Sequence, residues 1–184
     1  MDFFNQTGKL AIGSRLRMLT DKITVDAAAI YKMFGVDLKP KWFPVFFVLS
    51  RGEAKTITSI AKEIGHSHPS VSNIIKEMVA KGLVKETKDK SDGRRNMVML
   101  SAKGKRMSDS FSEQCIDVTA AIEQITQQTR NDLWEAIEEW ENLLLDKSLL
   151  ERVKEAKKER ESKDIKIVPY EPCYQSAFRT LNEE

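Results

Sequence analysis

The chain has 184 residues, of which 41% are hydrophobic and 32% charged, a composition typical of a globular protein with one good-sized domain and room for an appendage. Its two cysteines lie far apart in the sequence, which excludes a disulfide framework and a cysteine-based metal cluster and favours a cytoplasmic protein. No N-terminal signal sequence and no apolar run of roughly 20 residues is present, so neither secretion nor a membrane span is expected.

The net charge of +2 averages over two very different segments. Residues 66–106 hold ten Lys or Arg and four Asp or Glu, whereas residues 107–151 hold two basic and eleven acidic residues. A basic segment suits contact with a polyanion, and an acidic segment is repelled by one. We therefore expect a polyanion-binding module joined to a part that stays away from the polyanion.

The first predicted element is a long helix. Apolar residues recur at helical spacing from Phe3 to Phe34, and Gly35 follows, where a left-handed residue ends a helix at low cost. The next segment, residues 40–49, is the most apolar of the chain, and Pro40 is well placed to start a helix. We expect this second helix to be buried in the core.

A third helix is predicted over residues 56–64, and Gly65 ends it. Ala61, Gly65 and Val71 have the spacing of a helix-turn-helix: a small residue where two helices cross, a glycine in the turn, and a branched residue that locks the second helix. The sequence therefore predicts a helix-turn-helix centred on Gly65.

The second helix of this pair is expected to begin with Ser67 or His68 as its N-cap and to end at Gly82. The side chains expected to face inward are apolar: Val71, Ile74, Ile75, Met78 and Val79. Those expected to face outward are small or polar: Ser67, His68, Pro69, Ser70, Ser72, Asn73 and Lys76. Hydroxyl, amide and imidazole groups pair with base edges in the major groove, and lysine pairs with phosphates. This helix is thus predicted to be a DNA recognition helix.

Two runs of strand-like alternation follow, residues 83–89 and 96–101, joined by a polar segment that contains glycine. They predict a β-hairpin, which makes the unit a winged helix. The basic residues expected at its tip are Lys88, Lys90, Arg94 and Arg95. An arginine at such a tip can enter the minor groove, where the potential is most negative.

The stretch from Thr56 to Gly104 resembles the MarR family of transcription factors, above all in KGLV after the recognition helix and in the wing pattern D-x-x-D-G-R-R…L-S-x-x-G. The resemblance covers about residues 1–150. It implies a mainly α fold with a small β-wing, in which long terminal helices flank the winged helix and interlock two subunits. It further implies a homodimer on a pseudo-palindromic operator, with Asp92 orienting the wing arginines. The family usually has arginine where Ser91 stands, so one backbone contact is absent or taken over by Lys90.

The region after Ser101 again predicts helices. Apolar residues recur every three or four positions up to Ile125, and residues 129–132 give a capping signal before a second, acidic helix. These helices exceed what the winged helix could cover, so with the first helix they are expected to form the dimer interface. The residues proposed for that interface are Phe4, Leu10, Leu16, Ile137, Trp140 and Leu144.

Several residues have both a functional and a plain structural interpretation. Trp42, Phe43 and Phe46 could line a small-molecule effector pocket, where the family places ligands, or simply belong to the core. Cys115 could sense redox state, but its place on an apolar stripe favours packing. No catalytic constellation, metal-ligand cluster or cofactor motif is found within residues 1–150, so we expect a regulator and not an enzyme.

The last part of the chain differs from the rest. Residues 151–164 are nearly all charged and predict a solvated helix end or a linker. Residues 165–184 resemble the first strand and opening helix of a GNAT-type N-acetyltransferase, with a turn at Pro172 and with Phe178 and Leu181 on the helix. The expectation is a regulator joined in nature to an acetyltransferase whose catalytic part is missing here, and the alternative is an ordinary strand and helix docked on the dimer. A protein-binding winged helix without a nucleic-acid role is a third function class.

Overall fold

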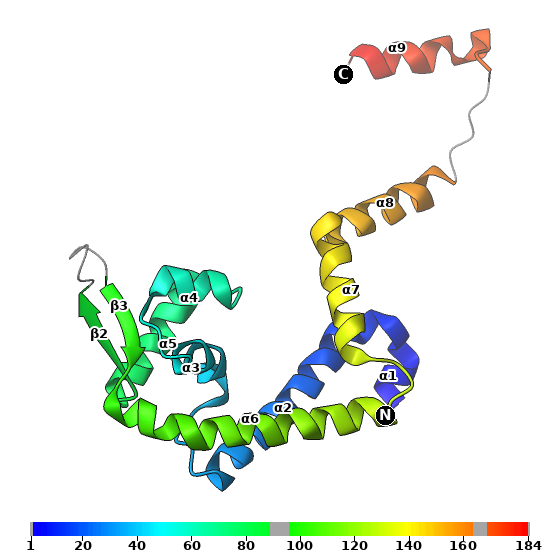
Figure 1. Ribbon diagram of the computed structural model, residues 1–184. Helices are drawn as coiled ribbons and strands as arrows, with labels where there is room; N and C mark the ends of the chain where they lie inside the picture. Colours follow the sequence, from blue (N-terminus) through cyan, green and yellow to red (C-terminus); the bar gives the residue numbers. More distant parts are fainter. Residues whose placement is uncertain (1, 89–95, 164–168, 184) are drawn as a thin grey trace. The chain divides into compact units, whose positions relative to one another are not determined.

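The computed structural model describes residues 2–88, 96–163 and 169–183 (Figure 1). The chain divides into two compact units, Met1–Gln124 and Ile125–Glu184. None of the described helices is both long enough and apolar enough to cross a membrane. The charge-rich composition and the amphipathic helices agree with this finding.

The first unit begins with α1 (Asp2–Thr7), a 3-10 turn η1 (Gly8–Ala11) and α2 (Ile12–Met33). The prediction of one unbroken helix from Phe3 to Phe34 is therefore wrong. Gly8 has φ 54°, a left-handed conformation that an α-helix of L-residues does not tolerate, and it interrupts the helix although the apolar pattern continues. The predicted end is confirmed, because α2 stops at Met33 and Gly35 follows with φ 66°.

The second predicted helix starts one turn later than expected. Pro40 opens a 3-10 turn, η2 (Pro40–Trp42), and the α-helix proper is α3 (Phe43–Ser50) with Pro44 in its first turn. A proline is tolerated there because the first amide groups of a helix have no intrahelical acceptor. The expectation that α3 is buried is confirmed by Val45, Phe46, Val48 and Leu49.

The predicted hairpin is present as β2 (Val84–Lys88) and β3 (Asn96–Leu100), which pair antiparallel with Val84 opposite Leu100 and Lys88 opposite Asn96. A third strand, β1 (Lys55–Thr56), pairs with β3 to give the sheet order β1-β3-β2. This strand is not predicted from the sequence, because two residues are too few to show an alternating pattern. The central strand is β3, and its Val98 and Leu100 are buried.

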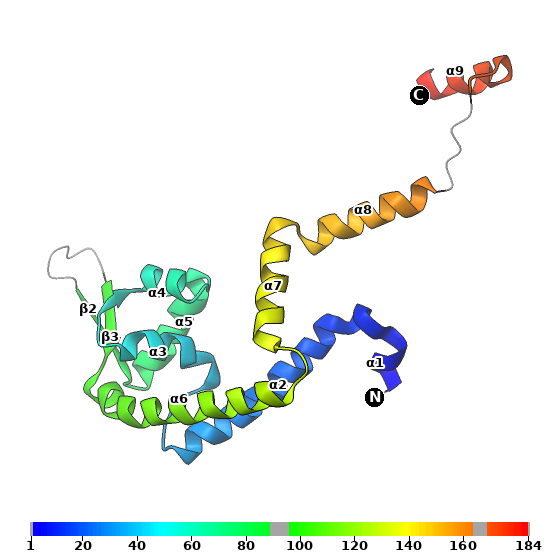
Figure 2. The same cartoon turned by 45° about the vertical axis from the view of Figure 1, so that its right-hand side comes forward.

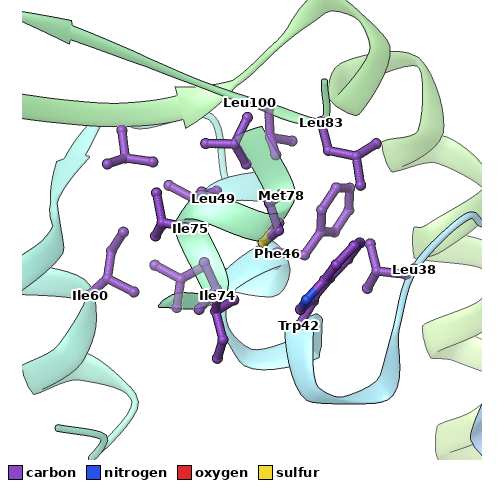
Figure 3. Packing of buried hydrophobic residues seen from close by; sticks show 14 of the residues in the cluster. Leu38, Trp42, Phe46, Leu49, Ile60, Ile74, Ile75, Met78, Leu83 and Leu100 are labelled. Atoms are coloured by element: carbon purple, nitrogen blue, oxygen red, sulfur yellow. The ribbon is translucent and has the colours of Figure 1, made fainter. Parts of the chain in front are cut away.

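Two helices lie between β1 and β2 in the sequence: α4 (Ile57–Glu63) and α5 (His68–Ala80). Figures 1 and 2 show both helices beside the hairpin, with α3 next to α5. Their inner faces and the sheet enclose one apolar core, in which Trp42, Phe46 and Met78 are among the largest fully buried side chains (Figure 3). Packing in this core sets the distance of α5 from the sheet and from α3, and so positions the outer face of α5.

The sheet is joined to α6 (Ala102–Gln128) by a compact junction around Ser101. The Ser101 hydroxyl donates to the carbonyl oxygen of Gly82 (2.6 Å) and accepts from the amide of Gly104 (3.1 Å). A Cβ added to Gly104 would lie 2.2 Å from the carbonyl oxygen of Leu83, so only glycine fits there. The L-S-x-x-G motif thus seats the start of α6 directly on the turn after α5.

The second unit contains α7 (Leu133–Asp146), α8 (Leu149–Ser162), a 3-10 turn η3 (Pro172–Tyr174) and α9 (Gln175–Glu183). Asp132 caps α7 as predicted, its carboxylate accepting from the amides of Trp134 and Glu135. Most of the charged segment 151–164 belongs to α8, which starts with a capping box between Ser148 and Glu151. The strand expected after Asp164 lies outside the described residues.

The corner between α7 and α8 is held by local hydrogen bonds. The Arg152 guanidinium donates to the carbonyl oxygens of Leu143 (2.8 Å) and Lys147 (3.1 Å), which belong to the last turn of α7 and its C-cap. Lys147 also pairs with Glu155 on α8. A cation bonded to the last carbonyl oxygens of a helix satisfies these acceptors and interacts favourably with the negative end of the helix dipole. Arg152 therefore stabilises the corner between the two helices.

Candidate nucleic-acid interface

The predicted helix-turn-helix is formed by α4, α5 and the turn between them. Thr56 caps α4 by accepting from the amide of Ser59 (3.1 Å). Gly65 makes the turn with φ 68°, and the His66 amide donates back to the carbonyl oxygen of Ala61 (3.0 Å). Glycine reaches this left-handed conformation without strain, which lets α5 start immediately after α4 ends.

The first turn of α5 is capped by Ser67, whose hydroxyl accepts from the amide of Ser70 (3.4 Å), and Pro69 follows in that turn. Of the two N-cap candidates, Ser67 is therefore the one used. Val71, Ile74, Ile75 and Met78 face the core as predicted. Val79 does not, because 39% of its surface is exposed: it falls just outside the buried stripe at the end of the helix.

The predicted DNA-reading side chains lie on the outer surface of α5. Ser67, His68, Pro69, Asn73 and Lys76 are exposed, and Ser70 and Ser72 are half-buried. Neither Asn73 nor Lys76 makes a side-chain hydrogen bond or ion pair with another described residue. Their donors and acceptors are thus available to an external partner.

The structure describes only part of the basic wing. Lys85 and Lys88 are exposed on β2, the strand that follows α5 and leads to the tip of the hairpin. Lys90, Asp92, Arg94 and Arg95 lie outside the described residues, so their roles stay predictions. The hairpin that carries them is confirmed by the pairing of β2 with β3.

The aromatic residues predicted for an effector pocket differ in burial. Trp42 and Phe46 are 1% and 0% exposed and pack in the core, whereas Phe43 is partly exposed and contacts Phe111 and Phe47. A separate cavity of about 170 Å³ lies between the end of α3, β3 and the start of α6. The side chains and backbone that line it belong to Leu49, Ser50, Gly52, Met99, Leu100, Lys105 and Ser108. The ligand role of Trp42, Phe43 and Phe46 stays a prediction.

Cys115 lies on α6 and is half-buried. Burial raises the pKa of its thiol, which keeps the sulfur protonated and therefore a poor nucleophile. Close to it, burial raises the pKa of Tyr31 to about 12, with the Cys115 thiol adding to the shift and a hydrogen bond with Gln114 opposing it. These features favour a packing role for Cys115. In the described parts of the chain, no group of His, Cys, Asp and Glu is arranged to hold a metal ion.

The residues proposed for a dimer interface are mostly uncovered within the single chain. Leu10 is 90% exposed, Phe4 is half-buried, and Leu16 on α2 is exposed. On α7, Leu133, Ile137, Trp140 and Leu144 recur at the spacing of one helix face and are all exposed. Apolar stripes of this length are covered in most proteins by another element or another chain.

One contact of α5 is not predicted from the sequence. Glu77, near the end of α5, accepts hydrogen bonds from Lys41 and from the indole of Trp42. The partners are 36 and 35 residues away in the sequence, and no periodicity or motif links them. An acid opposite the KPKW segment of residues 39–42 gives no signal in the sequence by itself.

Comparison with known proteins identifies the winged helix. Residues 36–95 match the family model described as MarR family. The fold is similar to that of the transcriptional repressor CouR bound to a 23-mer DNA duplex, with a TM-score of 0.56 and 20% identity over 76% of this chain and 96% of that chain. It is also similar to the PcaV transcriptional regulator from Streptomyces coelicolor in complex with its natural ligand (TM-score 0.55, 13% identity, 74% of this chain and 92% of that chain).

A third similar structure is the heme sensor protein PefR from Streptococcus agalactiae in complex with heme (TM-score 0.54, 16% identity, 75% of this chain and 95% of that chain). No curated protein sequence matches the chain. The mainly helical fold with a small three-stranded antiparallel sheet is thus confirmed as a winged-helix fold. Residues 36–95, which contain α3, the helix-turn-helix and the first strand of the wing, match the MarR family.

Proposed function

We propose that the chain is a sequence-specific DNA-binding transcriptional regulator that acts in the cytoplasm as a homodimeric repressor on a pseudo-palindromic operator. The observation that carries the proposal is the outer face of α5, where exposed polar side chains surround a capped helix N-terminus. The major groove admits a helix presented in this way, and base edges pair with amide and hydroxyl groups. The similarity in fold to CouR, whose structure contains a DNA duplex, supports a DNA-binding role.

The proposed homodimer rests on the uncovered apolar stripes. The exposed face of α7 and the exposed Leu10 and Leu16 would be covered by a second copy. Two recognition helices must lie about 34 Å apart to enter successive major grooves, and long terminal helices can hold them at that separation. Release by a small-molecule effector is part of the proposal, supported by the ligand in the PcaV structure and by the partly exposed Phe43.

Lys76→Ala is expected to weaken binding to all duplexes and to reduce its salt dependence, because one phosphate contact is lost. Asn73→Ala is expected to change the preferred sequence, since an amide discriminates bases by roughly 1–3 kcal/mol. Both effects are measured by titrating labelled duplexes at several salt concentrations and by selecting bound duplexes from a random pool.

The matched control is Lys158→Ala, which removes the same charge from an exposed position on α8, outside the winged helix. It should leave both the affinity and the salt slope unchanged. If Lys76→Ala behaves like this control, α5 does not approach the phosphates. A wild-type protein whose duplex binding is absent or insensitive to salt would instead favour the protein-binding winged helix.

We further propose that the segment after α8 begins an acetyltransferase domain of the GNAT type. A turn at Pro172 and the helix α9 are present, and Phe178 and Leu181 on α9 are exposed. The chain itself is expected to bind no acetyl-CoA, because no phosphate-binding loop accompanies this helix in the sequence. Calorimetric titration with acetyl-CoA tests this, and saturable binding would show that the chain is not catalytically empty.

A further inference from the structure

We propose that Glu77 is a positioning residue for DNA reading: it fixes the orientation of α5 by tying that helix to the connection between α2 and α3. The inference rests on the proposed DNA-binding function. It concerns the flank of α5 one turn after Asn73, between the outer face and the core, where a carboxylate meets two hydrogen-bond donors and a third, more distant cation.

The two oxygens of the Glu77 carboxylate have different partners. Oε1 accepts from the Lys41 ammonium at 2.7 Å, and Oε2 accepts from the indole Nε1 of Trp42 at 2.9 Å. The Lys39 ammonium lies 3.7 Å from Oε2. A carboxylate held through both oxygens by separate donors cannot turn without losing one of them.

The donors themselves are held in place. Trp42 is 1% exposed and packs in the core next to Leu38 (Figure 3). The Lys39 ammonium lies over its ring, 5.0 Å from the centroid. Because the buried indole keeps a fixed position, its Nε1–H group holds the Glu77 side chain, and with it α5, in a fixed place. Lys41 belongs to the same 3-10 turn, η2.

The hydrogen bonds of Glu77 add a directional restraint to the apolar packing of α5. Val71, Ile75 and Met78 are fully buried and set the depth of the helix, but hydrophobic contact has no preferred direction. A helix with its side chains has a radius of roughly 5–6 Å. A rotation of about 15° would therefore move the tips of Asn73 and Lys76 by about 1.5 Å, enough to break a hydrogen bond to a base. Directional bonds at Glu77 prevent that rotation.

The charge of Glu77 is needed for this arrangement. The hydrogen bond from Lys41 lowers the pKa of Glu77, followed by the hydrogen bond from Trp42, so the group is ionised at neutral pH. A glutamine has one acceptor oxygen and an NH2 group that only donates. In the position of the carboxylate, that oxygen replaces either Oε1 or Oε2, and the NH2 group faces the other donor, which makes Glu77→Gln an intermediate and nearly isosteric variant.

The experiment compares two duplexes of equal length, one selected by the wild-type protein from a random pool and one unrelated. Glu77→Ala is expected to weaken binding to the selected duplex about ten-fold and to leave binding to the unrelated duplex within about two-fold. Glu77→Gln should fall between. The direction of the change in affinity distinguishes the two explanations. If only the charge of Glu77 mattered, removing this acid near DNA would strengthen binding to both duplexes.

Glu86→Ala is the matched control, since it removes an exposed acid from β2 of the same winged helix. It should leave the ratio of the two affinities unchanged. In a Trp42→Phe background, Glu77→Ala should add much less than ten-fold, because the indole donor is already gone. The indole proton resonance of Trp42, assigned with Trp42→Phe, should shift in both Glu77 variants without any DNA present.

The outcomes are separable. If both Glu77 variants keep the wild-type preference, or if both duplexes are affected equally, the positioning role is overturned while the proposed function stands. If the wild-type protein itself selects no sequence, the proposed function fails and this inference fails with it. An unshifted Trp42 indole resonance in both variants would show that the hydrogen bond does not form in solution.

Discussion

Ile137→Glu combined with Leu144→Glu is expected to leave the protein monomeric and to weaken operator binding by at least about 100-fold. The two residues lie on the exposed apolar face of α7, and two carboxylates there would have to be desolvated if a second copy covered the face. A monomer reaches one half-site only, and losing the second of two linked contacts typically costs between about 100-fold and 10,000-fold in affinity. Sedimentation and titration of duplexes with one or two half-sites measure both effects.

Leu145→Glu serves as the control for this variant. Leu145 is the next residue along α7 and is 85% exposed, but it projects about 100° away from Leu144 around the helix. It adds a carboxylate to the same acidic segment without touching the proposed interface. A dimeric double variant that still binds the full operator, or a monomeric Leu145→Glu variant, would contradict the assignment of the interface.

Gly104→Ala is expected to lower the free energy of unfolding by about 3 kcal/mol, the upper end of what overpacking costs. The added Cβ would lie 2.2 Å from the carbonyl oxygen of Leu83 and 3.3 Å from side-chain atoms of Leu100. A backbone carbonyl cannot turn aside as a side chain does, because Leu83 is buried and its oxygen accepts from the amide of Ser101 (2.9 Å). Urea denaturation followed by circular dichroism gives the value.

Gly13→Ala supplies the comparison. Gly13 is also helical, in α2, but nothing lies within 4 Å of the position its Cβ would take. Alanine has the higher helix propensity, so this variant should be neutral or gain up to about 1 kcal/mol. Equal effects of the two substitutions would mean that α6 is not seated on Leu83 as described.

The parts of the molecule that can be predicted from the sequence are those whose signals are local. Gly65, Ser67 and Pro69 follow rules for turns and caps that depend on neighbours only, so these residues alone locate the helix-turn-helix and the start of α5. The alternation in residues 83–89 and 96–101 likewise locates the hairpin, because a strand with one buried face repeats every second residue.

The features that cannot be predicted in this way depend on contacts between distant segments or on a single backbone angle. Periodicity alone continues through Gly8, since a left-handed glycine leaves no mark on an apolar pattern. The hydrogen bond between Glu77 and Trp42 cannot be predicted without knowing that η2 packs against the end of α5. For the proposed DNA-reading face of α5, the residue types are evident from the sequence. The structure adds that Ser67 also acts as the cap, whereas Asn73 and Lys76 bond through their side chains to no other described residue.

The hydrogen bonds of Arg152 fix the angle between α7 and α8, so that α8 moves together with α7. Because these bonds to Leu143 and Lys147 lie within the helix pair itself, the direction in which α8 leaves α7 is set by contacts inside that pair. Fourteen helical residues extend this arm by roughly 20 Å. A tilt of a few degrees in α7 would therefore displace Ser162 by one or two ångströms, so a small movement at the proposed dimer interface would become a larger movement at the end of α8.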